Sequence, residues 1–389
     1  MPIVNRIAQF HDEMTEWRRA IHTHPETAFE EHATAEFVAA KLAQFGIEVQ
    51  RGLAGTGIVG SLKGARGDGP AIGLRADLDA LPIVEANDVP YRSRNEGRMH
   101  ACGHDGHTTM LLGAAKYLAE TRNFAGTVHF IFQPAEENEG GGRVMIEDGL
   151  FRRFPVESVY GMHNIPGIPA GEMAVRGGPV MAAFDIFEIA LKGHGAHAAT
   201  PHMGTDAIVA GAALVGQLQT IVARTVDPMQ SAVVSVTQIH GGSTWNVIPE
   251  EVVLRGTARW FRDEVGEKIE AAIRRISDGI AAAHGVAATV RYERRYPPTV
   301  NDAREAEFCA GVARGLVGED KLRMDRSPLM GAEDFAFMLR EKPGCYVWLG
   351  NGPGKAGCML HNPHYDFNDE ILPIGASYWA RLVETVLAP

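Results

Sequence analysis

The segment Thr127-Val128-His129-Phe130-Ile131-Phe132-Gln133-Pro134-Ala135-Glu136-Glu137 joins a short apolar run to two adjacent carboxylates. Similar apolar runs recur along the chain, and helical segments such as Thr108 to Glu120 separate them. The other runs are Gly57 to Leu62, Ala71 to Arg75, Ser158 to Met162 and Cys345 to Leu349. Strands that alternate with helices are typical of an α/β protein. The sequence therefore predicts a mixed, mostly parallel sheet with helices on both faces.

Polar side chains follow three of these predicted strands. Asp77 and Asp79 come after one strand, Glu136 and Glu137 after another, and His163 after a third. In sheets of this kind ligands bind at the carboxyl ends of the strands. We therefore expect these side chains to meet at one edge of the sheet.

A second segment, His100-Ala101-Cys102-Gly103-His104-Asp105-Gly106-His107, places three histidines and a cysteine in one glycine-broken turn. Taken singly, Cys102 would be interpreted as a small buried apolar residue. Glu137, His163 and His361 supply further donors elsewhere in the chain. Thiolate, imidazole and carboxylate together suit zinc, or nickel, cobalt or manganese. The combination therefore predicts a hydrolytic metal site.

The candidate ligands are Cys102, His104, Glu137, His163 and His361. Four of them would saturate a single zinc, whereas five donors shared by two ions leave room for solvent. We therefore expect two divalent metal ions per subunit, zinc before manganese, cobalt or nickel. Since Glu136 and Glu137 are neighbours, one can bind metal while the other serves as general base.

The chain of 389 residues is longer than the roughly 250 to 300 residues at which one hydrophobic core stops growing. After Gly177-Gly178-Pro179 the pattern changes to strand, helix, two strands, helix and strand, which predicts a ferredoxin-like unit. Its helices are expected over Asp206 to Thr225 and Asp263 to His284. We predict a discontinuous metal-binding catalytic domain, residues 1–180 and 296–389, and an inserted domain over residues 181–295.

Composition excludes several classes of partner. The formal net charge of -11 and the absence of a Lys or Arg run argue against nucleic acid. No stretch is apolar over the ~20 residues that a membrane helix needs, and the first residues do not resemble a signal peptide. The four cysteines are widely spaced, as in reduced cytosolic enzymes. We expect a cytoplasmic protein without a membrane partner.

Motifs along the whole chain resemble one enzyme family. They are Leu74 to Pro82, Met99 to Thr108, Gln133 to Glu137, Gly193 to His202, Asn246 to Pro249, Gly331 to Phe335 and His361 to Asp369. Together they resemble the two-metal amidohydrolases and peptidases that include hippurate hydrolase, aminoacylases, the auxin-conjugate amidohydrolases and, more distantly, carboxypeptidase G. The similarity is greatest to the hippurate hydrolase branch.

The resemblance implies a role for each residue of the metal site. Cys102 would bridge the two ions, and Glu136 would be the general base. Glu137 and His361 would complete one ion, and His104 and His163 the other. The carboxypeptidase branch has an Asp as bridging ligand and a His near the first strand end, where this chain has Cys102 and Asp77. Asp79 would orient a ligand.

For the inserted domain the resemblance implies a lid and a dimerisation surface. His197 would reach the substrate carbonyl and stabilise the developing oxyanion, from its own chain or from a partner subunit. Substrate contacts are expected at Asn246, Arg259 and Gly331, and the arginine fork suits a free carboxylate. A homodimer or homotetramer through this domain is expected.

We expect the reaction to be hydrolysis of the amide bond of an N-acyl amino acid, hippurate-like or N-acetylated, to a carboxylic acid and a free amino acid. A metallo-dipeptidase or carboxypeptidase would use the same ions and base and is the alternative. A catalytically silent peptide- or metal-binding relative is a third hypothesis. The full ligand set and Glu136 argue against it.

Overall fold

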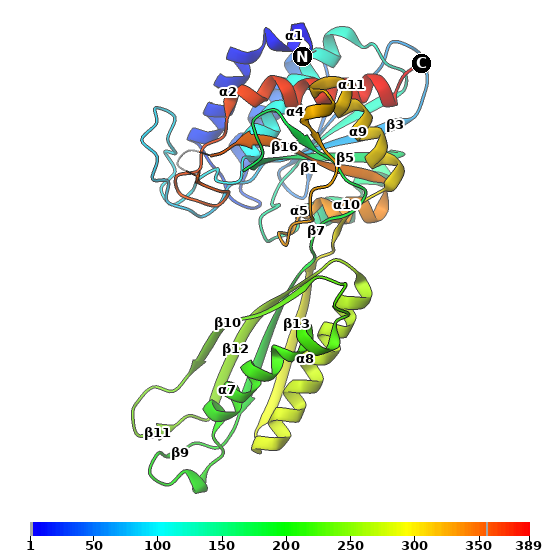
Figure 1. Ribbon diagram of the computed structural model, residues 1–389. Coiled ribbons are helices and arrows are strands. Elements are labelled where there is room, and N and C mark those ends of the chain that lie inside the picture. The colour runs from blue at the N-terminus through cyan, green and yellow to red at the C-terminus, as the bar shows by residue number, and fades with distance from the viewer. Residues whose placement is uncertain (1–2, 355–356) are drawn as a thin grey trace. The chain divides into compact units, whose positions relative to one another are not determined.

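The computed structural model describes residues 3–354 and 357–389, and it divides into two compact units, each with its own sheet (Figure 1). The first unit comprises Met1–Val180, Val300–Ser327 and Asp334–Pro389. The second comprises Met181–Thr299 and Pro328–Glu333. The chain thus leaves the first unit and later returns to it.

The first unit contains an eight-stranded mixed sheet in the order β1-β2-β4-β3-β5-β16-β6-β15. Its central strands β4, β3, β5 and β16 are mutually parallel, whereas β1, β2 and the β16–β6 pair are antiparallel. The strand bounds are β1 Glu48–Leu53, β2 Gly57–Lys63, β3 Ala71–Asp77, β4 Thr127–Gln133, β5 Ser158–Pro166, β6 Met173–Ala174, β15 Leu322–Arg323 and β16 Gly344–Gly352. The predicted mixed, mostly parallel sheet is confirmed.

Helices cover both faces of this sheet. Gly161 of β5 faces Phe335, while the next residue, Met162, packs beside Gly375. Successive strand residues point to opposite faces, so the helices that carry Phe335 and Gly375 lie on opposite sides. The helix bounds in this unit are α1 Asn5–Ala8, α2 His11–Thr23, α3 His32–Gln44, α4 His104–Thr121, α5 Gly141–Glu147, α6 Leu150–Arg153, α9 Ala303–Val317, α10 Phe335–Glu341 and α11 Leu372–Val386.

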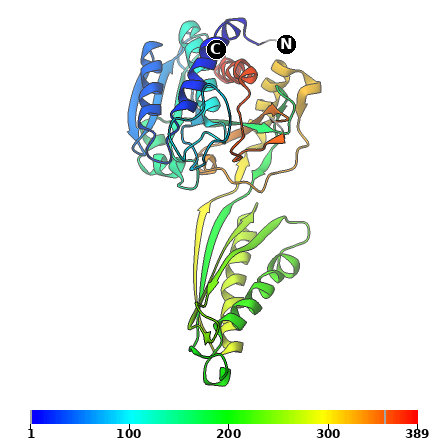
Figure 2. The same cartoon turned by 90° about the vertical axis from the view of Figure 1, so that its left-hand side faces the viewer.

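The second unit has the strand and helix order predicted from the sequence. Its four-stranded sheet, β10-β12-β8-β13, is antiparallel throughout. Helices α7 and α8 cover one face (Figures 1 and 2), burying Phe187, Ile189 and Leu191 at alternate positions of β8. The bounds are β8 Phe184–Lys192, α7 Ala207–Leu218, β10 Ala232–Gly241, β12 Glu251–Trp260, α8 Asp263–His284 and β13 Ala287–Tyr296, with the short strands β9 Ala196–His197 and β11 Val247–Ile248. Helix α7 ends before the predicted Thr225, and a π-helical turn follows over Ile221–Thr225.

The end of the inserted unit differs from the predicted residue 295. The unit runs to Thr299 and includes Pro328–Glu333, which were predicted to belong to the metal-binding domain. The reason is a backbone pairing that has no local sequence signal. The N–H of Ala182 donates to the carbonyl oxygens of Leu329 and Gly331, at 3.0 and 2.9 Å. None of the helices in the described residues is long and apolar enough to cross a membrane.

Candidate metal centre

The parallel strands bring their carboxyl ends to the same edge of the sheet. Asp77, the last residue of β3, is in register with Gln133, the last residue of β4. Glu136 and Glu137 follow β4 within four residues, and His163 lies near the carboxyl end of the adjacent strand β5. The strands therefore deliver carboxylates and an imidazole to one place, as the order of apolar runs indicated.

The turn before α4 presents Cys102 and His104 and depends on glycine. Gly103 has φ +100, and a Cβ there would lie 2.2 Å from Oδ1 of Asn164. A Cβ on Gly106 would lie 2.1 Å from the ring of Phe367. Any side chain at these positions would displace the turn from β5 or from the Phe367 segment. The glycines of this motif therefore have a steric function beside the metal donors.

The five candidate ligands form two groups that share Cys102. One group is Cys102, His104 and His163, and the other is Cys102, Glu137 and His361; within each group the donor atoms lie within 4.8 Å of one another. Sγ of Cys102 is 3.3 Å from Nε2 of His163. Nε2 of His361 is 3.2 Å from Oε1 of Glu137. This is the division of ligands that the resemblance implied for two ions.

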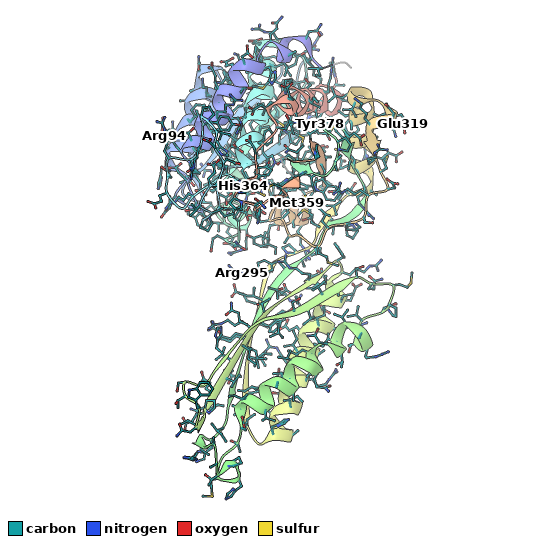
Figure 3. The ribbon with its side chains drawn as sticks, turned by 60° about the vertical axis from the view of Figure 1, so that its left-hand side comes forward. Arg94, Arg295, Glu319, Met359, His364 and Tyr378 are labelled. Carbon is teal, nitrogen blue, oxygen red and sulfur yellow. The ribbon has the colours of Figure 1, made fainter. Side chains whose placement is uncertain are left out.

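His361 reaches the centre from a loop that follows β16. Its φ is +63, and its N–H donates to the carbonyl oxygen of Ala101 at 2.8 Å. That bond ties the loop to the residue before Cys102. Figure 3 labels Met359 and His364, which lie on either side of His361 in the sequence. Cys102, His104 and His163 are buried and Glu137 is partly buried, whereas about half of the His361 side chain is exposed, so the centre opens to solvent on this side.

The charges of the two groups fit divalent cations. Hydrogen bonds to Cys102 and Glu137 raise the pKa of His361 to about 10, so without a metal the imidazole carries a positive charge beside the Glu137 carboxylate. Burial lowers the pKa of the His163 imidazole, which favours the neutral form that binds metal. Nε2 of His104 is buried and has no hydrogen-bond partner among the described residues. A buried ring nitrogen that lacks a hydrogen-bond partner and lies beside a thiol and a second imidazole is available to bind a metal ion.

Asp79 contacts a predicted ligand of each ion. Nδ1 of His104 donates to the carbonyl oxygen of Asp79 at 2.8 Å and lies 3.2 Å from its Oδ1. Oδ2 of Asp79 accepts the backbone N–H of Glu137 at 2.9 Å. A histidine that donates from Nδ1 keeps its Nε2 lone pair for a metal. These contacts fit the expected orienting role of Asp79.

Glu136 lies beside these donors. Carboxylate oxygens of Glu136 and Glu137 and a ring nitrogen of His104 fall within 4.8 Å of one another. The two glutamates sit in a turn whose flanking residues, Ala135 and Asn138, have φ of +54 and +69. In this conformation neighbouring side chains diverge from the regular strand alternation. The turn thus brings both glutamates to the donor cluster, as two different roles require.

A buried network beneath the ligands was not predicted from the sequence. Nδ1 of His107 lies 2.6 Å from Oδ1 of Asp77, and Nε2 of His107 lies 2.8 Å from Oδ1 of Asn164. Arg75 donates to Asp77 and Asp334, at 2.8 Å each. Asp77, His104 and His107 also cluster closely enough to hold an ion, but Asp77 and His107 already have these partners. In the sequence, this network could have been inferred from Arg75, a cation within an apolar strand.

The remaining predicted site residues belong to the second unit. His197 of β9 pairs with Val247 of β11, and the N–H of Ala198 donates to the carbonyl oxygen of Asn246 at 3.0 Å. The structure therefore brings His197 and Asn246 together. Arg259 lies on β12, with its guanidinium 4.1 Å from the ring centroid of Phe184. Gly331 is exposed, in the segment that pairs with Ala182.

Comparison with known proteins assigns the class. Residues 73–385 match Peptidase family M20/M25/M40, and the chain belongs to this family. A hippurate hydrolase from Campylobacter jejuni is 41% identical over 382 residues, covering 98% of each chain. An N-acetylcysteine deacetylase from Bacillus subtilis is 39% identical over 381 residues, covering 97% of this chain and 98% of the relative.

A solved structure shows the same architecture. The dinuclear metal-binding peptidase of family M20 from Bacillus subtilis is 36% identical, with a TM-score of 0.84 over 98% of this chain and 99% of the other. The protein is accordingly a metal-dependent amidohydrolase with candidate ligand groups for a dinuclear centre. The predicted family and enzyme class are confirmed.

Proposed function

We propose that the protein hydrolyses the amide bond of N-acyl amino acids, hippurate-like or N-acetylated. The observation that carries this proposal is the pair of donor groups that share Cys102, with the Glu136 carboxylate beside them. The names of two relatives, hippurate hydrolase and N-acetylcysteine deacetylase, support the substrate class.

In this proposal Cys102, Glu137 and His361 would hold one ion, and Cys102, His104 and His163 would hold the other. Two bound divalent ions lower the pKa of a water molecule and polarise the amide carbonyl. Zinc is the proposed ion, because a thiolate with imidazoles is a soft donor set; manganese, cobalt and nickel are alternatives. Asp79 keeps His104 in the required tautomer and fixes the backbone of Glu137.

Glu136 acts as the general base. Its carboxylate takes a proton from the attacking water while the water oxygen bonds to the acyl carbon. The same proton then passes to the amide nitrogen as the C–N bond breaks, which releases a carboxylic acid and a free amino acid. A base in this position typically contributes ~10² to 10⁴ in rate.

The second unit would supply contacts to the rest of the substrate. His197 would donate to the oxyanion that develops on the acyl oxygen, and Asn246, its neighbour across the β9–β11 pair, would bind the substrate beside it. Arg259 is half-buried and makes no ion pair among the described residues, so its fork is available for the substrate carboxylate. Gly331 would approach the substrate through its backbone.

We also propose a homodimer or homotetramer through the second unit. Strand β10 is an edge of its sheet, which leaves backbone groups available for pairing. Large apolar side chains are exposed in this unit: Met203, Ile208, Val209, Ile239, Trp245 and Val247. Sedimentation velocity should give a dimer or larger, and a monomer at micromolar concentration would contradict the proposal.

The test of substrate class is a panel of N-acyl amino acids and unblocked dipeptides, assayed with zinc, manganese, cobalt and nickel. We expect kcat/KM to be highest for N-benzoyl or N-acetyl amino acids. A preference for dipeptides would instead indicate a metallo-dipeptidase or carboxypeptidase. Absence of turnover with every metal, despite two bound ions, would indicate a catalytically silent relative.

A further inference from the structure

Glu31 is a buried carboxylate that the proposed reaction does not use. It lies just before α3, and its side chain is buried against the segment that carries Glu136. Oε1 of Glu31 accepts the N–H of Ala135 at 2.9 Å and the N–H of Phe29 at 3.0 Å. Oε2 accepts the hydroxyl of Thr56 at 2.7 Å. Glu31 thus joins three segments at the residue immediately before Glu136.

The residue that Glu31 holds is in a strained conformation. Ala135 has φ +54, and its carbonyl oxygen accepts the N–H of Gly141 at 2.9 Å. The left-handed conformation costs an L-residue with a Cβ roughly 1–2 kcal/mol. Such a conformation persists only where the surroundings determine it. Here the Ala135 peptide is fixed on one side by Glu31 and on the other by Gly141.

The two glutamates that follow are therefore held by different carboxylates. On the N-terminal side, Glu31 fixes the N–H of Ala135, next to Glu136. On the C-terminal side, Asp79 fixes the N–H of Glu137 and also contacts His104. Asp79 touches two predicted metal ligands, whereas the hydrogen bonds of Glu31 include none. The two carboxylates should consequently affect different steps.

We propose that Glu31 is a positioning residue that sets the direction of the Glu136 carboxylate by holding the strained peptide of Ala135. This inference rests on the proposed function, in which Glu136 is the general base. Displacing a reacting group by about 1 Å can lower the rate ~10²-fold, so loss of the clamp should act on turnover. Metal binding should be nearly unaffected, because the Asp79 contacts remain.

Burial of the Glu31 carboxylate lowers the stability of the fold, which a role in packing alone would not explain. Its hydrogen-bond partners are two backbone N–H groups and a hydroxyl, all of them neutral. Burial, with the nearby charge of Asp79, raises the pKa of Glu31 to about 7. A buried carboxylate without a cation destabilises the fold relative to an apolar side chain. Its presence there is accounted for by the bond to Ala135.

The experiment compares Glu31→Ala with Glu31→Gln and with Glu30→Ala. Glu30 is the exposed neighbour, whose contact is an ion pair with Arg98 at 2.6 Å, and its variant is the matched control. Glu31→Ala should lower kcat about 10- to 100-fold, with KM changed less than threefold and two metal ions retained. Glu31→Gln keeps an acceptor oxygen for Ala135 and should recover most of kcat. Glu30→Ala should match the unmodified protein.

Three results would overturn the proposal: kcat of Glu31→Ala within twofold of the unmodified protein, metal loss in proportion to activity, or equal loss in the Gln and Ala variants. If Glu31→Ala does not fold, Thr56→Val removes the hydroxyl that orients Glu31 and should lower kcat several-fold with metal retained. Unchanged kcat in a folded Thr56→Val would also contradict the clamp. Glu136→Gln is assayed in parallel. If it retains turnover, the base assignment fails; if it is inactive while Glu31→Ala is fully active, only the clamp fails.

Discussion

The metal centre and the β9–β11 pair differ in how firmly the fold holds their polar side chains. In the first unit Cys102, His104 and His163 are buried, and His104 is oriented by Asp79. In the second unit His197 and Asn246 are exposed. The first arrangement is preorganised within one chain, whereas the second leaves its imidazole facing solvent. The first unit therefore orients its candidate ligands through its own contacts, whereas the exposed imidazole of His197 has no comparable support among the described residues.

The largest effect is expected from Cys102→Ala. Removing the donor shared by both groups should abolish binding of both ions together with turnover, because neither remaining pair of donors can hold an ion tightly. Metal content by plasma mass spectrometry and activity check this. Cys358→Ala, which alters a thiol outside the candidate groups, is the control and should keep two ions. Two tightly bound ions in Cys102→Ala would disprove the shared ligand.

Glu136→Gln separates the base from the ligands. Two ions should remain, while kcat falls ~10² to 10⁴-fold, because the variant loses proton transfer but no donor. Metal analysis beside steady-state kinetics provides the measurement. Loss of both ions would mean that Glu136 and Glu137 have exchanged roles.

His197→Ala tests the role of the exposed imidazole in the second unit. It should lower kcat about 10² to 10³-fold, the range for one oxyanion donor, and leave both ions in place. His194→Ala changes an exposed imidazole three residues away and should have little effect. Reduced metal occupancy in His197→Ala would place this residue in the metal centre instead.

Mixing two inactive variants shows whether His197 acts in its own chain or in a partner subunit. His197→Ala chains and Glu136→Gln chains are each expected to be inactive. If His197 acts in the neighbouring subunit, exchange between the two should regenerate some complete sites and measurable turnover. If subunits exchange, as shown by mass-labelled chains, and activity does not return, His197 acts within its own chain or not at all.

The smallest effect is expected on the pH dependence of the free energy of unfolding, through Glu31. The folded-state pKa of Glu31 is about 7, above the ordinary value of 4.5, so the folded protein binds the proton more tightly. Stability from this group is therefore present below pH 4.5 and is lost as pH rises through 7. Between these limits the slope is at most about 1.4 kcal/mol per pH unit. Melting temperatures from pH 5 to 8 should fall more for the unmodified protein than for Glu31→Gln; parallel curves would refute the shift.

The sequence predicted the donors of the metal centre and the orienting role of Asp79, but not the role of Glu31. Cys102, His104 and His361 stand in glycine- or proline-containing turns beside apolar runs, which is a local pattern. Glu31 lacks such a pattern. Glu31 is 104 positions from Ala135, and a glutamate just before a helix is ordinary in sequence. Its burial becomes visible only when distant segments are packed together.

In the inserted unit, too, some features were predicted from the sequence and one depended on contacts between distant segments. Alternation in β8 and the helical spacing of α8 predicted the ferredoxin-like order, because burial on one face imposes a period of two on strands and 3.6 on helices. The end of the unit depended on hydrogen bonds from Ala182 to Leu329 and Gly331, far along the chain. Backbone pairing of this kind is independent of side-chain type and leaves no pattern.

By itself the sequence determined the α/β class and the family resemblance, and it predicted the inserted unit and the donor set, because periodicity and donor chemistry are properties of local segments. Tertiary structure decided how closely the donor atoms approach one another, that Asp79 contacts candidate ligands in both groups, and that Glu31 holds the strained Ala135. Those facts depend on distances between segments that are remote in the chain. Such distances arise only when burial of the apolar faces fixes the segments against one another.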